Sequence, residues 1–515
     1  MTHSQSTALY ERFLRGLAAH PRRDAARAGG RSISYEAAHE LALRWAGALR
    51  PRLVGPAPAV GVLADKGIDA YVGLLAALYT GAAVVPLHPA FPAARTRAML
   101  LAAGVSAVFA DAAGAKALAA TGVDTPVLAL DSDGGGPGAG WGAALAEPVP
   151  VNAADAAYIL FTSGSTGTPK GVPISHANTD HYFRLMDERY RFTAEDVFSQ
   201  TFDLNFDCAM FDLFCAWGAG AAVQAVPAGA YRAMPEFVAQ HGLTVWFSTP
   251  SSIALLRRTG GLAPGALPSL RWSLFAGEAL QAADAATWQA AADRSTLENI
   301  YGPTELTVTV SGHRWSPHGS PALCVNGLVP IGSVHPGHAY LLLGEDGEEA
   351  HTEGELCITG AQMTAGYLDP ADNEGRFLVR AGRRWYRTGD RVRLLPNGEL
   401  VYFGRVDAQV QVQGWRVELA ELDHALRGCA GVEDAATVAR AGAKGTELVA
   451  FYTGVPAAPA ELVRRLRETL PEGMLPREFR HLDRLPLNPN RKVDRSRLAR
   501  VAAGEGADLG VRGPA

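Results

Sequence analysis

The chain has little of what zinc sites, disulfide frameworks and membrane spans require. Its 515 residues contain five cysteines, and no two of these have the C-x-x-C spacing of a metal or redox motif. The cysteines therefore predict neither zinc nor disulfides, and they favour a reducing, cytoplasmic location. No apolar run free of both charges and helix breakers reaches the roughly 18 residues of a membrane span, and the N-terminus shows no signal-peptide pattern. We therefore expect no membrane partner.

An excess of one charge is also lacking. The chain has 47 Lys and Arg against 52 Asp and Glu, a net charge of −5, so no basic field predicts binding to nucleic acid or to an anionic membrane. A chain of this length exceeds one ordinary hydrophobic core and predicts about two to four domains or subdomains. A soluble enzyme with several domains is the resulting expectation.

Up to about residue 400, strand-like and helix-like segments alternate. Strand-like runs such as "AVGVLA" (59–64) and "WSLF" (272–275) alternate with helical segments such as "GIDAYVGLLAALYTG" (67–81). This order predicts an α/β fold with a largely parallel sheet covered on both faces. Between about 328 and 404, short strands and turns, with "PNG" as a hairpin signal, predict a small antiparallel barrel or sandwich. A mixed segment with one amphipathic helix in "VELAELDHALRG" follows to about residue 500, and the tail 503–515 is expected to be disordered.

A glycine-rich stretch, "FTSGSTGTPKG" (161–171), follows the apolar run "AAYIL". Glycine lets backbone N–H groups approach an anion closely, hydroxyl groups add donors, and Lys170 adds a positive charge. The glycine spacing and Pro169 before the lysine exclude a Walker loop. A flexible linker is the alternative, but a linker rarely carries Pro-Lys-Gly between two apolar runs. The stretch therefore predicts a phosphate loop at the carboxyl end of a strand.

Two further stretches offer groups that suit a nucleotide. "ENIYGPTEL" supplies the ring of Tyr301, the hydroxyl of Thr304 and the carboxylate of Glu305, which suit ring stacking, a phosphate and Mg²⁺. Taken alone, this stretch could equally be a surface turn. "WYRTGD" ends on Asp390, whose carboxylate can accept hydrogen bonds from two ribose hydroxyls. The order of these stretches along the chain is more specific than any one of them.

Other stretches extend the pattern through nearly the whole chain, from "YTGAAVVPLHPAFP" through "GELCITGAQMTAGYLDP" and "GRVDAQVQVQGWRVE" to "LPLNPNRKVDR". On these motifs the chain resembles the adenylate-forming superfamily of acyl-CoA synthetases, luciferases and nonribosomal-peptide adenylation domains. It is most similar to stand-alone amino-acid adenylation enzymes, including the D-alanine–carrier-protein ligases. The resemblance implies two steps: a carboxylate attacks the α-phosphorus of ATP to give an acyl-adenylate and pyrophosphate, and a phosphopantetheine thiol then takes the acyl group. Such phosphoryl chemistry is catalysed mainly by positioning the reactants and stabilising the charge of the transition state.

The resemblance also implies how the fold is divided. A large N-terminal adenylation domain (1–404) is expected to contain two α/β subdomains and a small β-barrel. A smaller, mobile α+β C-terminal lid domain (411–502) is expected to follow a hinge (405–410). Asp407 lies at the hinge position, although it could instead cap a turn. The lid is expected to rotate so that Lys492 leaves the site and the loop around Gly414 enters it for thiolation.

The cofactors that the resemblance implies are ATP and Mg²⁺. Glu305 would bind Mg²⁺, Thr304 would bond the α-phosphate, and Lys492 would be the catalytic lysine that bridges the substrate carboxylate and ATP. The other expected nucleotide-binding residues are Thr162, Ser163, Gly164, Ser165, Thr166, Gly167 and Lys170 at the β- and γ-phosphates and pyrophosphate, Tyr301 stacked on adenine with Gly302 next to it in the chain, and Asp390 and Arg405 at the ribose. Two residues depart from the family pattern: Gln411 stands where Lys is usual, and Arg491 where Gly is usual.

The stretch "TFDLNFDCAMFDLF" (201–214) places three aspartates among apolar residues, which is unfavourable unless a cation is present. The resemblance places Asp207 where α-amino-acid enzymes bind the substrate ammonium. The alternative is that Asp207 caps a helix, and Asp203 and Asp212 are interpreted as structural. The expected substrate-binding residues are Asp207, Cys208, Phe211, Phe247, Leu274, Ala276, Gly277, Ile300, Val308 and Thr309, with Lys492 closing the pocket.

This lining leaves little volume and no second charge, so it favours a small neutral α-amino acid. Alanine is expected as the preferred substrate over glycine and serine. Some activation of the other two is also expected, because only a methyl or a hydroxyl group distinguishes the three. The D-alanine ligases usually carry Cys where this chain has Ala276, which favours L-alanine over D-alanine.

The expected partner is a phosphopantetheinylated acyl carrier protein acting in trans, because no carrier segment follows residue 500 and no condensation domain precedes residue 1. Biosynthesis of a peptide-containing natural product and alanylation of a cell-wall polymer both fit. One alternative is an acyl-CoA ligase of the same fold. Its fatty or aryl substrate has no ammonium group, so a carboxylate at Asp207 would be unfavourable. Another is a non-catalytic nucleotide-binding or scaffold protein, which has no physical reason to keep Lys170, Glu305, Asp390 and Lys492 together.

Overall fold

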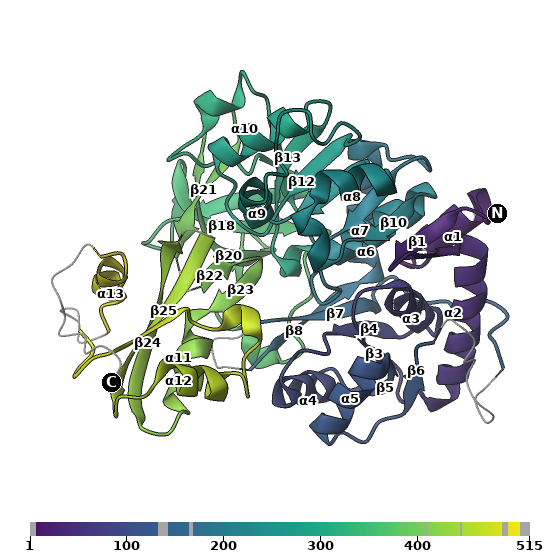
Figure 1. Ribbon diagram of the computed structural model, residues 1–515, viewed down its shortest axis with the longest axis horizontal. Helices are drawn as coiled ribbons and strands as arrows, with labels where there is room; N and C mark the ends of the chain where they lie inside the picture. The colour runs from purple at the N-terminus through teal and green to yellow at the C-terminus, as the bar shows by residue number, and fades with distance from the viewer. Residues whose placement is uncertain are drawn as a thin grey trace.

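The computed structural model describes residues 7–131, 143–163, 168–406, 409–442, 445–486 and 493–504. Two sheets with their helices form most of the molecule, a third sheet packs beside them, and a small C-terminal unit lies at one side (Figure 1). This arrangement confirms the predicted α/β class with a large N-terminal and a small C-terminal domain.

The first sheet has six strands in the order β6-β5-β3-β4-β7-β8, and all but β8 run parallel. Its strands are β3 (Ala59–Leu63), β4 (Ala83–Leu87), β5 (Val105–Ala110), β6 (Val127–Ala129), β7 (Ala156–Thr162) and β8 (Lys170–Ser175). Thr162 pairs with Lys170 across β7 and β8. The glycine-rich stretch therefore connects two antiparallel strands at the carboxyl end of β7, where the sequence placed it.

The second sheet has nine strands in the order β15-β14-β13-β12-β11-β9-β10-β1-β2. Its strands are β1 (Asp24–Ala28), β2 (Arg31–Ser34), β9 (Val197–Gln200), β10 (Ala222–Ala225), β11 (Val245–Ser248), β12 (Trp272–Phe275), β13 (Thr296–Tyr301), β14 (Ser311–Arg314) and β15 (Ser333–Val334). The six strands from β13 to β1 are parallel. Their carboxyl ends meet at one edge of the sheet, which is where ligands gather in such folds.

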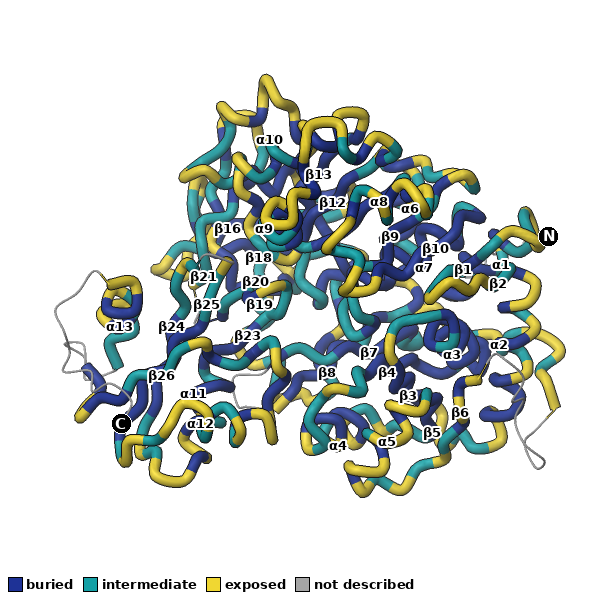
Figure 2. The backbone as a smooth tube through the Cα atoms, viewed as in Figure 1, coloured by how far each residue is buried: buried dark blue, intermediate teal, exposed yellow. Residues whose placement is uncertain are grey.

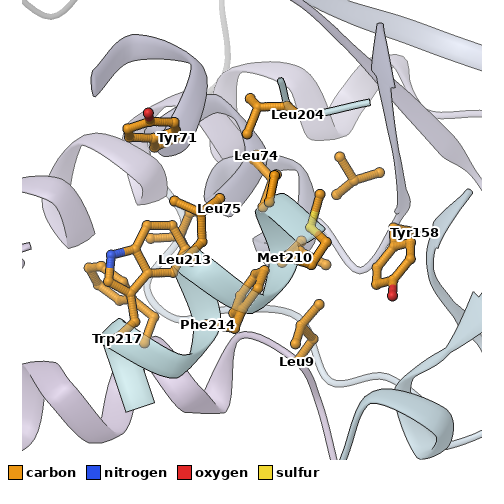
Figure 3. Close-up of a cluster of buried hydrophobic side chains, with 14 of the residues drawn as sticks. Leu9, Tyr71, Leu74, Leu75, Tyr158, Leu204, Met210, Leu213, Phe214 and Trp217 are labelled. Atoms are coloured by element: carbon orange, nitrogen blue, oxygen red, sulfur yellow. The ribbon is translucent and has the colours of Figure 1, made fainter. Parts of the chain in front are cut away.

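Ten helices belong to these two sheets: α1 (Glu11–Ala19), α2 (Tyr35–Leu49), α3 (Ile68–Tyr79), α4 (Ala93–Ala102), α5 (Ala112–Thr121), α6 (His176–Tyr190), α7 (Cys208–Ala219), α8 (Met234–His241), α9 (Ser251–Arg258) and α10 (Ala282–Ala291). Helix α3 contacts strands of both sheets, and α7 packs on β9 and β10. Figure 3 shows Met210, Leu213 and Phe214 of α7 packed with Leu74 and Leu75 of α3. Both helices are apolar nearly all round, which is the pattern of a helix buried between two layers.

The third sheet is antiparallel and follows in the chain. It comprises β16 (His338–Leu343), β17 (Glu349–Ala350), β18 (Glu353–Gly360), β19 (Phe377–Arg380), β20 (Arg383–Leu394) and β21 (Leu400–Arg405). The predicted turn at "PNG" joins β20 to β21. The segment 328–334 differs from the expectation, because β15 within it pairs with β14 and so extends the nine-stranded sheet.

The small C-terminal domain begins with the hairpin β22 (Gln409–Val412) and β23 (Trp415–Glu418). Helix α11 (Leu419–Arg427), β24 (Val432–Gly442), β25 (Gly445–Gly454), α12 (Pro459–Leu466), β26 (Glu478–His481) and α13 (Arg495–Ala502) follow it. Two apolar clusters of its own form its core, and Figure 2 shows buried residues along β24 as well as along β9 and α3 of the large domain. The helix predicted in "VELAELDHALRG" is α11. Within the described ranges, no helix is long and apolar enough to cross a membrane.

One buried histidine of the large domain has no hydrogen bond from its ring to any described residue. His335 is 4% exposed and neither ring nitrogen has a partner within the described part of the chain. Burial, together with smaller contributions from the nearby Arg189, His338 and His181, lowers the pKa of His335 to about 3. The folded protein therefore holds His335 neutral under conditions in which the unfolded chain takes up a proton.

We expect this histidine to make the fold acid-sensitive. Between pH 6.5, the ordinary value for histidine, and pH 3 the unfolded state binds one proton more than the folded state at His335, so stability falls as pH falls. The free energy of unfolding should fall by about 2 kcal/mol between pH 7 and pH 5. Denaturant unfolding at both pH values measures it. His335→Gln should reduce this pH dependence while the exposed His318→Gln leaves it intact, and equal slopes in both variants would contradict the assignment.

Candidate active site

A cavity of about 830 Å³ lies where the strand ends of the large domain face the small domain. Thirteen of the residues expected to bind substrate or nucleotide line it: Thr162, Ser163, Asp207, Cys208, Ala276, Gly277, Ile300, Tyr301, Gly302, Thr304, Val308, Asp390 and Arg405. Phe211, Phe247 and Leu274 are fully buried behind this lining. Gly164, Ser165, Thr166, Gly167, Asp407, Arg491 and Lys492 lie outside the described residues.

The residues expected at adenine and ribose meet at one end of the cavity. Asp390 on β20 and Arg405 on β21 are cross-strand partners, and Arg405 Nη1 donates to Asp390 Oδ1 at 2.6 Å. Tyr301, the last residue of β13, donates its hydroxyl to Asp390 Oδ2 at 2.5 Å. Residues that are far apart in sequence thus form one polar cluster because the antiparallel sheet packs beside the end of β13.

The backbone that follows β13 is strained. A Cβ on Gly302 would lie 2.6 Å from Thr309 Cα, so only glycine fits there. Thr307 and Val308 have φ of 57° and 66°, a conformation that β-branched residues rarely adopt. Gln362 holds this turn by donating its side-chain amide to the carbonyls of Leu306, Thr307 and Thr309. The sequence did not single out Gln362, although it lies in the quoted stretch "GELCITGAQMTAGYLDP".

Glu305 is a buried carboxylate with both oxygens occupied. Its Oε1 accepts the hydroxyl of Tyr367 at 2.6 Å, and its Oε2 accepts Arg416 Nη1 at 2.9 Å. Burial alone would raise the pKa of Glu305, but the Arg416 guanidinium and the Tyr367 hydroxyl outweigh it and hold the pKa below the usual value. Within the described ranges, no cluster of three or more His, Cys, Asp and Glu could hold a metal by itself. A single carboxylate suits Mg²⁺ that is held mainly by substrate phosphates.

Asp207 lies at the start of α7, but its side chain makes no capping hydrogen bond. Asp207 is 9% exposed, and its Oδ2 has no partner among the described residues. Burial raises the pKa of Asp207 to about 6, which hydrogen bonds from Thr304 and Cys208 oppose and the charge of Glu305 reinforces. An unpartnered carboxylate oxygen in a cavity is a group that a cation would stabilise.

Aromatic rings close the cavity near Asp207. The ring centroids of Phe211 and Phe247 are 5.1 Å apart, and those of Phe202 and Phe247 are 4.9 Å apart. Phe202 lines the cavity itself, and it was not among the expected pocket residues. Thr309 lies away from the cavity lining, where its hydroxyl bonds that of Tyr182 at 3.1 Å. The space beside Asp207 is therefore narrow and apolar.

The described ends of the glycine-rich stretch already have partners. Lys170 is buried, and its Nζ lies 3.0 Å from Asp372 Oδ1. The Ser163 hydroxyl donates to the Arg416 carbonyl at 2.6 Å and accepts from the Glu418 N–H at 3.2 Å. Strand β23 of the small domain therefore lies directly against the start of this stretch.

The turn between β22 and β23 also lines the cavity. Gly414 has φ of 85°, and a Cβ there would lie 2.9 Å from Thr249 Cγ2. Its N–H donates to Glu278 Oε1 at 2.8 Å. With its side-chain amide oriented to satisfy both atoms, Gln411 donates to the carbonyl of Gly277 at 3.1 Å. The glutamine that departs from the family pattern thus contacts a residue of the expected substrate pocket.

Comparison with known proteins agrees with this geometry. The AMP-binding enzyme family matches residues 13–368, and the AMP-binding enzyme C-terminal domain matches residues 421–492. An L-proline–[L-prolyl-carrier protein] ligase of Pseudomonas fluorescens is 32% identical over 510 residues, covering 96% of this chain and 99% of that protein. A dimodular nonribosomal peptide synthase of Bacillus subtilis is also 32% identical, but the chain spans only 20% of it.

Solved structures show the same similarity. The crystal structure of IdnL7 is 57% identical with a TM-score of 0.74, covering 97% of this chain and 100% of that one. The Vibrio cholerae adenylation domain AlmE, in complex with glycyl-adenosine-5′-phosphate, is 27% identical with a TM-score of 0.83, covering 98% and 99%. The chain therefore belongs to the AMP-binding enzyme family.

Proposed function

We propose that this chain is an amino acid–[carrier protein] ligase. It activates a small neutral α-amino acid with ATP as an aminoacyl-adenylate and passes the aminoacyl group to the phosphopantetheine thiol of a separate carrier protein. The observation that carries the proposal is the buried, unpartnered Oδ2 of Asp207 in the cavity. A substrate ammonium supplies the cation that this oxygen lacks, and a simple carboxylic acid does not.

The nucleotide end of the cavity supports ATP as the second substrate. Tyr301, Asp390 and Arg405 already form one cluster there, and Gly302 lines the same cavity. Thr304 lies beside Asp207, between the two ends, where its hydroxyl can bond the α-phosphate. Mg²⁺ bound at Glu305 would neutralise charge on the phosphates. The role of Lys492 at the substrate carboxylate stays a prediction from the sequence.

Relatives support the class of reaction. The proline ligase that this chain matches end to end acts, by its name, on an amino acid and a carrier protein, and the similar AlmE structure holds a glycyl-adenylate. These findings favour amino-acid activation over the CoA-ligase alternative. We further propose that residues 1–404 and 411–502 are the two domains and 405–410 their hinge, and that the β22–β23 turn, whose Gly414 lines the cavity, serves the second step.

Alanine is the first candidate substrate, with the L isomer favoured because Ala276, which lines the cavity, stands where the D-alanine ligases usually carry Cys. Phe211, Phe247 and Phe202 limit the space beside Asp207. We expect Phe247→Gly to shift preference by at least about tenfold toward a larger side chain such as leucine, because filling the vacated volume is worth about 2 kcal/mol. Relative kcat/KM for alanine and leucine measures the shift. The control is Phe237→Gly on the distant helix α8, and an unchanged preference in Phe247→Gly would show that this wall is not the pocket.

The experiment that tests the function is ATP–pyrophosphate exchange over a panel of L- and D-alanine, glycine, serine, bulky and β-amino acids, and simple carboxylic acids. Strong exchange with one small α-amino acid supports the proposal, whereas exchange only with an amine-free acid refutes Asp207 as the anchor. Thioester formation on a phosphopantetheinylated carrier protein, compared with free CoA, then separates the ligase from its CoA-dependent alternative. Product-forming turnover with CoA alone would refute the carrier-protein step.

A further inference from the structure

The buried carboxylate of Glu305 has a cation, and the small domain supplies it. Arg416 on β23 places Nη1 2.9 Å from Glu305 Oε2, and the two side chains are 16% and 1% exposed. Gln409 accepts Arg416 Nε at 3.1 Å, so the guanidinium is held on a second side. This ion pair joins residues 111 positions apart in the chain and crosses the interface between the two domains.

The same strand occupies a second group of the expected pyrophosphate end. The Ser163 hydroxyl bonds the Arg416 carbonyl and the Glu418 N–H. Nearby, Arg95 of α4 and Glu421 of α11 form another buried ion pair between the domains at 2.6 Å. The docked position of the small domain thus occupies Glu305, which the proposed function gives to Mg²⁺, and Ser163, one of the residues that the sequence predicts at the phosphates.

Both oxygens of the buried Glu305 carboxylate already have partners, and Arg416 at Oε2 supplies its cation. Without any cation the charge of Glu305 would stay in a poorly solvated site, which is costly. A Mg²⁺ ion held at Glu305 would add a second positive charge beside the guanidinium, and like charges repel in a low-dielectric site. Mg²⁺ and Arg416 would therefore compete for Glu305.

We propose that Arg416 is a positioning residue that exchanges with Mg²⁺ at Glu305, so that the small domain docks as seen here only after Mg²⁺ and pyrophosphate have left. The inference rests on the proposed function for the identity of the metal. It gives the order of the two half-reactions a physical cause: the guanidinium takes over the charge that the departing metal leaves uncompensated.

The first test measures docking rather than turnover. Donor and acceptor dyes are placed on exposed positions of the two domains by Lys116→Cys and Arg464→Cys, with the partly exposed Cys324 replaced by serine. Mg²⁺ with pyrophosphate should reduce energy transfer in this labelled protein. Arg416→Met should reduce the docked population at least tenfold without any ligand. Arg427→Met, which removes a small-domain arginine that pairs with Asp434 on the surface, should behave like the parent.

A second substitution separates the charge exchange from simple packing. Glu305→Gln combined with Arg416→Met removes both charges, so the docked population should recover to within about threefold of the parent. Arg416→Lys keeps one positive charge and should keep both docking and its release by Mg²⁺ with pyrophosphate. The lysine variant also serves if Arg416→Met fails to fold.

The inference is overturned if Arg416→Met docks as the parent does, or if adding Glu305→Gln restores nothing. It is also overturned if Mg²⁺ with pyrophosphate leaves energy transfer in the parent unchanged. None of these readouts needs an amino acid or a carrier protein. A failure of pyrophosphate exchange with every acid would refute the proposed function, and it is measured separately from docking.

Discussion

Asp207→Asn should lower kcat/KM for the amino acid in pyrophosphate exchange by roughly a thousandfold, about 4 kcal/mol of transition-state stabilisation. The reason is that asparagine keeps the shape of the side chain but cannot neutralise a substrate ammonium in a buried site. The same change should leave the thermal midpoint unchanged or raise it. The Asp207 pKa of about 6 means that ionising this residue in the folded protein costs up to about 3 kcal/mol at neutral pH.

Asp203→Asn is the matched control from the same stretch. The side chain of Asp203 is 38% exposed, and Lys66 and His88 lie 3.9 and 3.7 Å from it, so its replacement should change exchange by less than about twofold. Comparable losses in the two variants would mean that the whole stretch supports the fold. In that case Asp207 would not be the ammonium anchor.

Glu305→Gln should lower the rate of pyrophosphate exchange by at least about a hundredfold and raise the Mg²⁺ concentration needed for half-maximal rate. A neutral amide is a weaker Mg²⁺ ligand than a carboxylate, and the charge on the phosphates is then poorly compensated. Because Glu305 is almost fully buried beside Tyr367 and Arg416, the substitution also leaves the guanidinium of Arg416 without its carboxylate. Exchange rates measured across a Mg²⁺ titration separate the metal effect from a general loss of activity.

Glu353→Gln provides the control for this prediction. Glu353 on β18 pairs with Arg391 and Arg393 at the surface of the antiparallel sheet, away from the cavity lining. Its replacement should leave the Mg²⁺ titration unchanged. If Glu305→Gln raised no Mg²⁺ requirement, Glu305 would not be a metal ligand.

Much of the fold was predictable because its signals are local. Apolar runs marked β3 and β12, and an apolar segment of helical character marked α3. The "PNG" turn marked the β20–β21 hairpin for the same reason. Periodicity, however, does not say which sheet a two-residue strand joins. That is why β15 was assigned to the antiparallel region although it extends the nine-stranded sheet.

The candidate site was predictable only in part. Asp207, Tyr301 and Asp390 lie in short stretches whose residue types suit an ammonium and a nucleotide, and the structure brings these stretches to one cavity. Phe202 and Gln362 were missed because an aromatic ring or an amide in such a stretch has no spacing that distinguishes a site residue from a packing residue. Their roles depend on contacts with residues far away in the chain.

The sequence by itself determined the class of fold, the order of its elements and the chemical groups available at the strand ends, because these follow from nearest neighbours along the chain. Only the tertiary structure decided that Arg416 lies on Glu305 and that Gln411 reaches Gly277. Both contacts cross the interface between the two domains. Their energy comes from burial and charge pairing after the chain has folded, and no local pattern in either segment encodes the partner.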